Sequence, residues 1–351
     1  MNAPMNIQKQ YYYPWFDWLR GSLAISIMLT HEGLIAWGHS GNFAVQVFFA
    51  LSGWLIGGIL IKLKPEQLTK FYFNRAIRIW VPYYLALILL VCASLLHDPI
   101  TGKWLEFVFY KLSFVYNIFG NSQLADYMQA MPLQGTGNHF WSVNAEEQFY
   151  LLAPLILVLI RHPFARSTLL WLVIAAFAYF NNIYASIVFG VLAAVSVNQY
   201  GNFHEKFEVK LIFGLALIAS IIGFYLHFNY DKIVPFAAIS LILLLSHKGK
   251  QHKIGAIFGG MSYQLYLNHW IGLFVAHALL KPYGLRDSAY SYMMSISLNM
   301  MIAVALYWFI DKRLLAMRGE LFTKKRGLVT TTIAYSMVII GCLVGFTLLN
   351  A

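Results

Sequence analysis

Ionisable side chains recur inside apolar stretches of this chain, and their types define the chemistry it could perform. The first such stretch, FDWLRGSLAISIMLTHEG, contains Arg20 and His31. Eleven residues of helix make three turns plus about 20°, so both side chains fall on one face, about 16 Å apart along the axis. Asp17 precedes Arg20 by three residues and can pair with it. The alternative is that Arg20 snorkels to an interface and His31 is a packed core histidine, which the shared face disfavours.

Two adjacent carboxylates open another apolar segment, NHFWSVNAEEQFYLLAP, in which Glu146 and Glu147 lie about two turns from the start. Their directions differ by about 100°, so we expect at most one of them to face the interior of a helix bundle. Short acidic side chains cannot snorkel to an interface from that depth, which favours a functional role. A further segment, MSYQLYLNHW, carries His269, whose alternative role is that of a hydrogen-bonded core histidine.

Two arginines and one serine complete the set of candidates. Arg75 and Arg78 lie three residues apart in FYFNRAIRIWVPYY, on a helix that we expect to enter the apolar run at 80–97. Paired guanidinium groups with aromatic neighbours can bind phosphates and stack on a base, although positive charge of this kind also marks cytoplasmic loops. Ser52 in FFALSGW is not surrounded by a G-x-S-x-G elbow, so we expect a backbone-bonded hydroxyl rather than a nucleophile. Gly53 and Gly57 form a small-xxx-small pattern that suits close helix packing.

The composition of the chain indicates which elements position these residues. Of the 351 residues, 60% are hydrophobic and only 11% are charged, whereas a soluble domain carries about 25% charged residues. The mean hydropathy is +0.62. These values exclude a soluble enzyme, a disordered chain and a nucleic-acid-binding module, and they predict an all-α, polytopic transmembrane helix bundle. Cys92 and Cys342 both lie in apolar runs, so we expect no disulfide framework and no thiolate metal site.

About eleven membrane spans are predicted from the apolar runs and the residues that bound them. The predicted spans cover residues 15–36, 43–61, 80–97, 140–160, 168–180, 183–198, 210–228, 233–246, 254–276, 289–310 and 328–348. The sequence shows no internal repeat and no low-complexity tract, so we expect a single membrane-embedded domain over residues 1–351, without a soluble domain.

The stretch 104–120 is apolar but carries Glu106 and Lys111. If it does not cross the membrane, the Lys and Arg residues divide 20 to 5 between the two sides. If it crosses, they divide 10 to 14, with Lys111 inside the span. The positive-inside rule favours the first division. We therefore expect segment 98–139 to be external, with 104–120 interfacial or re-entrant, the N-terminus cytoplasmic and the C-terminus external.

This topology separates the candidate residues by depth. The imidazole and carboxylate groups of His31, Glu146, Glu147 and His269 fall in the outer half of the membrane. His139 falls just outside the membrane on the same side. The guanidinium groups fall at the inner side: Arg20, Arg75 and Arg78. The sequence thus predicts a buried tunnel with different chemistry at its two ends.

The motifs that carry these residues resemble those of the acyltransferase-3 family of integral-membrane O-acyltransferases. Arg20 and His31 match its R-x10-H signature, and FFALSGWLIG, NRAIRIWVPYY, WSVNAEEQFYL, SYQLYLNHW and YWFIDKR resemble further family elements in the same order. The resemblance assigns the most characteristic acid to Glu146 and the later histidine to His269. Gln46 stands where the family often has Asp, and Asn74 and Val81 also depart from the pattern.

The resemblance implies transfer of an acyl group, usually acetyl, from cytoplasmic acyl-CoA to a hydroxyl of an extracytoplasmic glycan or glycolipid. The inner arginines would bind the phosphates of the coenzyme, whose pantetheine arm would reach along the tunnel. We assign His31 as general base, oriented by Glu146, with a covalent acyl-His31 intermediate as a second possibility. Arg20, Ser52, Glu147 and His269 are further candidates for the pocket. No metal is expected, and the lipid bilayer is the expected environment, in the cytoplasmic (inner) membrane.

Two other classes of function compete with this interpretation. Intramembrane His and Glu residues could form the relay of a proton-coupled transporter, although transporters commonly show inverted repeats and the sequence shows none. A non-catalytic membrane scaffold would use the same polar residues for helix association.

Overall fold

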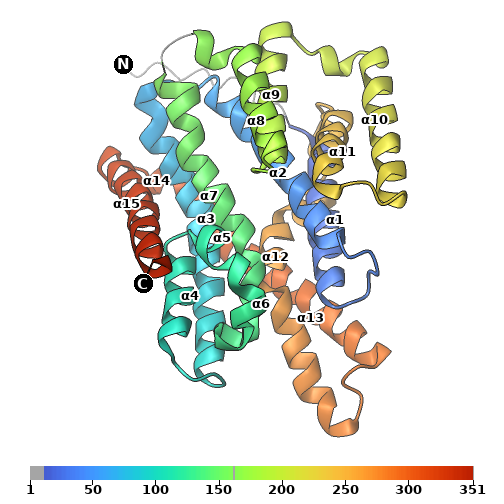
Figure 1. The fold of residues 1–351 in the computed structure, drawn as a ribbon, viewed down its shortest axis with the longest axis vertical. Helices are drawn as coiled ribbons and strands as arrows, with labels where there is room; N and C mark the ends of the chain where they lie inside the picture. Colours follow the sequence, from blue (N-terminus) through green and yellow to red (C-terminus); the bar gives the residue numbers. More distant parts are fainter. Residues whose placement is uncertain (1–11, 161–162, 351) are drawn as a thin grey trace.

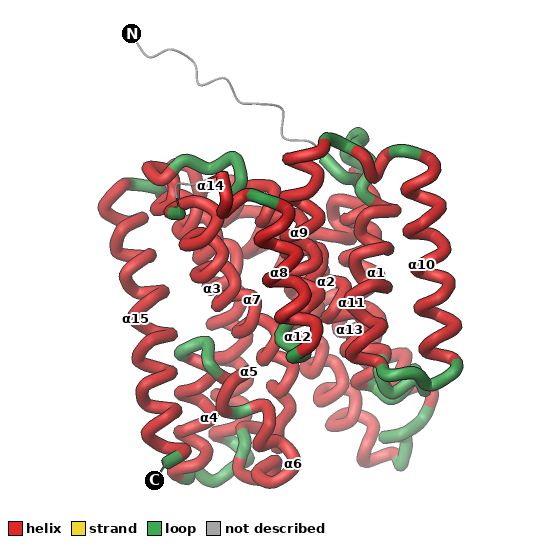
Figure 2. Tube along the Cα trace, turned by 45° about the horizontal axis from the view of Figure 1, so that its top comes forward, coloured by secondary structure: helices red, strands yellow, loops and turns green. Residues whose placement is uncertain are grey.

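The chain is helical throughout the part that the structure describes. The structure is a computed structural model that describes residues 12–160 and 163–350, and every regular element in these ranges is a helix (Figures 1 and 2). Helices coincide with all the predicted spans: α1 (Pro14–His31), α2 (Ser40–Leu60), α3 (Leu68–Leu95), α7 (Trp141–Pro154), α8 (Thr168–Phe180), α9 (Ala185–Tyr200), α10 (Phe207–Tyr225), α11 (Tyr230–Leu245), α12 (Lys253–Leu280), α13 (Ala289–Leu306) and α15 (Lys324–Leu349). The predicted all-α bundle is confirmed.

Five helical segments in the described residues are long and apolar enough to cross a membrane: Ser40–Leu60, Pro65–Leu95, Phe207–Tyr225, Ala289–Leu321 and Lys324–Leu349. The last but one joins α13, a π-helical segment (Tyr307–Asp311) and α14 (Lys312–Leu321). Helices α8 and α9 are apolar but shorter. Helices α1, α7 and α12 carry the charged and polar side chains of the candidate site. The total of about eleven crossings stays a prediction.

The stretch 104–120 does not form one continuous helix. Helix α4 (Gly102–Leu112) ends before Phe114, whose φ of 56° breaks the helix, and α5 covers Tyr116–Phe119. The eleven residues of α4 span about 16 Å, roughly half the thickness of the hydrocarbon core. Lys111 is buried with its ammonium 3.2 Å from the centroid of the Tyr116 ring. Helices α4 and α6 (Leu124–Tyr127) lie at the end of the bundle where α15 ends, opposite α14 (Figure 2).

Helix α3 begins at Leu68, twelve residues before the predicted start of its span at residue 80. Arg75 and Arg78 are therefore part of the helix, as expected, although the span itself was placed from residue 80. The helix continues through Pro82, whose side chain is buried. Because both arginines belong to the helix, the rotation of α3 determines that both side chains line the same cavity.

Helices α2 and α9 pack in close contact. A Cβ atom at Gly53 would lie 2.0 Å from the carbonyl oxygen of Ile187, and one at Gly190 would lie 2.2 Å from that of Ala50. The expected packing role of Gly53 is confirmed, since backbone meets backbone at this crossing. Gly58, one turn further along α2, has no atom within 4 Å of a Cβ position.

This difference gives a matched pair of substitutions. We expect Gly53→Ala to destabilise the protein by about 1–3 kcal/mol, because the added methyl group must push two backbones apart. Gly58→Ala should leave stability unchanged or raise it slightly, because alanine favours the helix more than glycine. Thermal unfolding of both variants in the same detergent measures the effect, and an equal midpoint for the two would contradict the packing argument.

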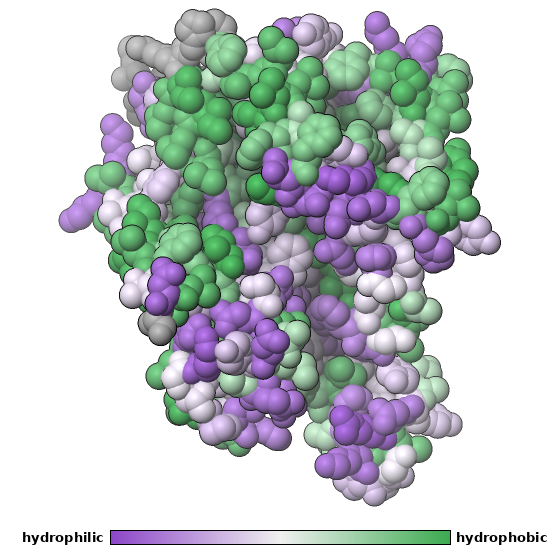
Figure 3. All heavy atoms as spheres, in the orientation of Figure 1, coloured by the Kyte–Doolittle hydropathy of each residue, from purple (hydrophilic) through white to green (hydrophobic). Residues whose placement is uncertain are grey.

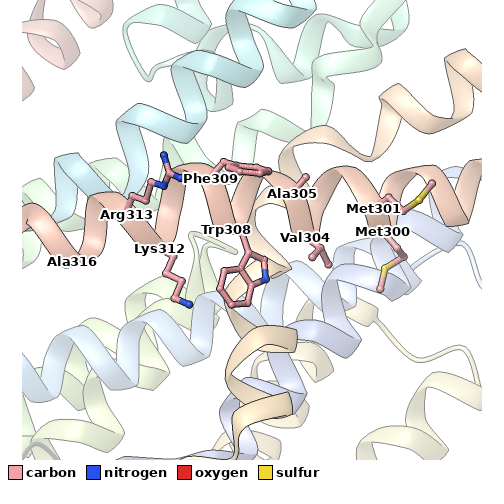
Figure 4. A pocket seen from close by; sticks show the side chains of 9 residues that line it. All are labelled: Met300, Met301, Val304, Ala305, Trp308, Phe309, Lys312, Arg313 and Ala316. Atoms are coloured by element: carbon pink, nitrogen blue, oxygen red, sulfur yellow. The ribbon is translucent and has the colours of Figure 1, made fainter.

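The outer surface is largely apolar, as expected for contact with lipid. Figure 3 shows apolar side chains over much of the upper part of this face, with polar groups gathered in the middle and below. A groove of about 890 Å³ runs along α13 and α14 (Figure 4), lined by Met300, Met301, Val304, Ala305, Trp308, Phe309, Lys312, Arg313 and Ala316. It includes residues of the YWFIDKR element, but none of the candidate catalytic or substrate-binding residues lines it. It is therefore not the candidate site.

Candidate active site

Two adjoining cavities inside the bundle contain most of the predicted site residues. The inner cavity, of about 420 Å³, is lined by Arg20, Arg75, Arg78, Ser52 and Glu146, among others. The outer cavity, of about 490 Å³, is lined by His31, His139, His269 and Glu32, among others. Val45 and Tyr266 line both cavities, so the two share a wall. The guanidinium and imidazole groups are separated as predicted, one set in each cavity.

The centre of the outer cavity is a pair of histidines from α1 and α12. His31 is the last residue of α1 and His269 lies in the middle of α12. The Nδ1 atom of His31 lies 2.6 Å from the Nε2 atom of His269. His269 is 4% exposed, whereas His31 is exposed toward the cavity. Of this pair, His31 is the imidazole that a bound molecule can reach.

The backbone assigns the protons of this pair. The Nδ1 atom of His269 lies 2.9 Å from the carbonyl oxygen of Tyr266. A carbonyl oxygen only accepts, so Nδ1 of His269 carries the hydrogen and its Nε2 is the acceptor. His31 must then donate its Nδ1–H to His269, which leaves the lone pair on Nε2 of His31. This is the tautomer that a histidine base requires.

His269 is therefore a positioning residue for His31. We expect His269→Ala to lower the rate of the reaction that His31 serves by about 10²-fold, because the imidazole loses the acceptor that fixes its tautomer. His269→Gln should recover part of the rate, since a side-chain oxygen can again accept from Nδ1. Steady-state kinetics of both variants measure this, and equal losses in the two would argue against the tautomer assignment.

His139 is a third member of the cluster, which the sequence placed just outside the membrane. It lies in a 3-10 segment, η4 (Pro132–Phe140), that includes positive φ angles at Leu133, Gln134 and Gly135. This turn returns the chain to the bundle, and the His139 ring centroid lies 4.7 Å from that of His269. The sequence signal was its position at the start of NHFWSVNAEEQFYLLAP, which alone gives no spatial neighbour.

The three imidazoles could hold a transition metal, because one nitrogen of each lies within 4.8 Å of the others. Two nitrogen ligands on one tetrahedral zinc ion are about 3.3 Å apart, given Zn–N bonds of about 2.0 Å. The 2.6 Å contact between His31 and His269 is shorter than that and fits a direct hydrogen bond. Metal binding would require this pair to separate, and the expectation that no metal is needed stays a prediction.

Glu146 does not contact His31, and its assignment as the acid that orients the imidazole is wrong in this structure. The hydroxyl groups of Ser52 and Tyr150 both donate to Oε1 of Glu146, which lines the inner cavity. Glu146 follows His139 by seven residues, or about 10 Å along a helix. It is thus too far along α7 to reach the histidine cluster, and His269 takes the place expected for it.

Glu147 is also inside the bundle, contrary to the expectation that at most one of the two carboxylates faces the interior. It is 3% exposed, and its Oε1 accepts a hydrogen bond of 2.9 Å from Nε1 of Trp80. It lines neither of the two cavities. Glu147 therefore joins α7 to α3 and is not a residue of the pocket.

The inner cavity presents guanidinium groups that lack carboxylate partners. The ion pairs found among the described residues do not include Arg20, Arg75 or Arg78. The expected pairing of Asp17 with Arg20 is not found there; Asp17 accepts instead from the hydroxyl of Tyr12. Arg75 lies over the Tyr150 ring, 5.8 Å from its centroid, and its Nε has no hydrogen-bond partner. Such a set favours an anionic ligand.

One cavity-lining acid has no role in the sequence interpretation. Glu32 follows His31, is 6% exposed and lines the outer cavity. Its Oε1 accepts hydrogen bonds from Ser295 and Asn299 of α13. The only signal in the sequence was its place beside His31 at the end of the predicted span.

Comparison with known proteins identifies the family. A family model described as Acyltransferase domain, that of the acyltransferase-3 family, matches residues 13–312 and thus contains every site residue named above. No solved structure matches the chain.

Two curated relatives show the extent of the similarity. The chain is 27% identical over 215 residues to "Peptidoglycan O-acetyltransferase OatA" of Listeria monocytogenes, covering 59% of this chain and 33% of the relative. It is 31% identical over 167 residues to "O-acetyltransferase OatA" of Staphylococcus aureus, covering 45% of this chain and 27% of the relative. The similarity thus spans about a third or less of these relatives' length. The match over residues 13–312 shows that this chain belongs to the acyltransferase-3 family.

Proposed function

We propose that this protein transfers an acyl group, in the first place acetyl, from cytoplasmic acyl-CoA to a hydroxyl group of an extracytoplasmic cell-wall glycan. The observation that carries the proposal is the pair of adjoining cavities, one lined by free guanidinium groups and the other by a histidine with an available lone pair. The names of the relatives, which are O-acetyltransferases, support acetyl as the group and peptidoglycan as the acceptor.

The inner cavity suits the donor. Arg75 and Arg78 on α3 and Arg20 on α1 would bind the phosphates of coenzyme A through charge-assisted hydrogen bonds. The apolar side chains of α2 that line the same cavity, Phe48, Phe49, Leu51, Leu55, Ile56 and Ile59, would contact the pantetheine arm. Arg20 and His31 lie about 16 Å apart on α1, so a long, thin arm is needed to bring a thioester from one end to the other.

The outer cavity suits the acceptor and the chemical step. The acceptor hydroxyl would donate to Nε2 of His31, which takes its proton as the oxygen attacks the thioester carbonyl. The carbon–sulfur bond then breaks, the ester forms, and the thiolate of coenzyme A leaves and takes up a proton. His269 continues to accept from Nδ1–H of His31 when the ring is charged. A variant of this step, in which Nε2 itself carries the acyl group, uses the same free lone pair.

The orientation in the membrane follows from charge. The end of the bundle with α14 and the start of α15 carries Lys312, Arg313, Lys324, Lys325 and Arg326. We place this end, which lies opposite α4 and α6 in Figure 2, in the cytoplasm. The arginine-lined cavity then opens toward the compartment that supplies acyl-CoA.

Sealed vesicles test the proposal directly. Purified protein is reconstituted with a soluble N-acetylglucosamine pentamer inside the vesicles and radiolabelled acetyl-CoA outside. Labelled ester on the enclosed pentamer is the expected result. Label that stays on coenzyme A, together with release of the unmodified pentamer from the vesicles that is driven by a pH gradient, would replace the proposal by the proton-coupled transporter.

A further inference from the structure

Two residues that line the outer cavity each have a buried polar atom that no described residue satisfies. The Oε2 atom of Glu32 and the Nε1 atom of Trp270 are both buried without a hydrogen-bond partner. Both residues line the outer cavity, at 6% and 8% exposure. A buried polar atom without a partner is costly and calls for an explanation. One of these atoms needs a donor and the other needs an acceptor.

The carboxylate of Glu32 is held in place rather than left free to turn away. Ser295 donates to its Oε1 at 2.5 Å and Asn299 donates at 3.3 Å. The oxygen of the Asn299 amide accepts from the backbone N–H of Gly272 at 2.8 Å, which fixes the orientation of that amide. Ser295 and Asn299 are themselves buried. Because Oε1 takes both of these hydrogen bonds, Oε2 is the oxygen left without a donor.

The other walls of the cavity suit a sugar. Trp141, Trp270 and Phe274 provide aromatic surface, on which pyranose rings pack through their C–H faces. Thr136 and Asn138 add polar groups. The volume of about 490 Å³ lies in the usual range for a small-molecule site. A sugar hydroxyl both donates and accepts, so a pyranose offers the donor that Oε2 of Glu32 lacks and the acceptor that Nε1 of Trp270 lacks.

We propose that Glu32 and Trp270 form the acceptor-binding subsite, in which a neutral pyranose donates a hydroxyl hydrogen bond to Oε2 of Glu32 and accepts one from Nε1–H of Trp270. This inference rests on the proposed function for the identity of the bound sugar as the acyl acceptor. Two hydrogen bonds to fixed groups would hold the ring, and the reacting hydroxyl would lie at Nε2 of His31, which lines the same cavity. Neither residue takes part in proton transfer, so their loss should affect binding of the acceptor and not of the donor.

The test uses Glu32→Gln and Trp270→Phe, which keep the shape of each side chain. For the N-acetylglucosamine pentamer as acceptor, each variant should raise KM by roughly 10-fold or more, because one hydrogen bond to the sugar is lost or reversed. The KM for acetyl-CoA should not change. Glu320→Gln and Trp308→Phe, both outside the two cavities, are the matched controls and should behave like the unsubstituted protein.

Binding without acyl-CoA separates this inference from the proposed function. Saturation-transfer NMR of the pentamer with the detergent-solubilised protein should show binding that is weakened in both variants and retained in both controls. This result would support the subsite even if no acyl transfer occurs. Unchanged KM and unchanged binding in both variants, or no binding of the pentamer to the unsubstituted protein, would overturn it. Melting temperatures of all four variants show whether a loss of binding reflects unfolding.

Discussion

His31→Ala should lower acyl transfer by about 10²–10⁴-fold, the usual contribution of a general base, while the protein still folds and binds acyl-CoA. The expectation rests on the tautomer of the histidine pair. Nδ1–H of His31 donates to His269, which leaves the lone pair on Nε2 of His31, and His31 lines the outer cavity. Initial rates of acetyl transfer to the pentamer measure the loss. The rate should not recover at high acceptor concentration, because the missing group acts in the chemical step.

The control for this experiment is His97→Ala. The side chain of His97 is 78% exposed and lies outside both cavities, so its removal should leave the rate unchanged. Size-exclusion profiles and melting temperatures compare the folding of the two variants. A His31→Ala protein that acylates at nearly the original rate would remove His31 from the mechanism. If the rate falls only in proportion to the fraction of folded protein, the role of His31 is structural.

Helix positions could be predicted from the sequence because lipid imposes a simple rule. Apolar runs bounded by charges marked a helix at each of the eleven predicted places. The helix around Arg75 and Arg78 was expected, but its start at Leu68 and the place of both arginines inside the bundle were not. A helix tolerates arginines where its polar face lines a cavity, and that cavity is visible only once the neighbouring helices are placed.

The separation of the arginines from the histidines could be predicted, but Glu146 was expected with the histidines and lies with the arginines. The rotation of each helix about its axis could not be predicted. The separation of guanidinium from imidazole groups follows from residue counts along each helix. Which side chain meets His31 depends on how α1, α7 and α12 are turned, and this is where Glu146 was assigned wrongly and His269 was underestimated. His139 enters the cluster through a turn of unusual backbone geometry, which no periodicity in the sequence indicates.

The burial of Glu32 could not be predicted from the sequence either. Its partners, Ser295 and Asn299, lie more than 260 residues away along the chain. A glutamate at the end of a predicted span is ordinarily assigned to the interface, where water satisfies it. Only the packing of α13 against the end of α1 reveals an acid with one satisfied and one unsatisfied oxygen.

Removal of the inner guanidinium groups should abolish efficient use of acyl-CoA. The double variant Arg75→Gln, Arg78→Gln loses two of the three arginines that line the inner cavity. We expect KM for acetyl-CoA to rise by roughly 100-fold or more, because each charge-assisted hydrogen bond contributes about 1.5–3 kcal/mol. The kcat should change little, because His31 and His269 belong to the other cavity.

Acetyl-pantetheine, a donor without the coenzyme's phosphates, distinguishes phosphate binding from a general disturbance of the cavity. The unsubstituted protein should use this donor poorly, and the double variant should use it equally poorly, because the arginines have no phosphate to bind. Arg326→Gln, which removes an exposed charge at the same end of the bundle, should not alter KM for either donor.

If the double variant loses activity with both donors to the same extent, the arginines support the structure of α3 and the phosphates bind elsewhere. If only the acetyl-CoA reaction suffers, the inner cavity is the donor site, and the thioester must travel from it along α1 to reach His31.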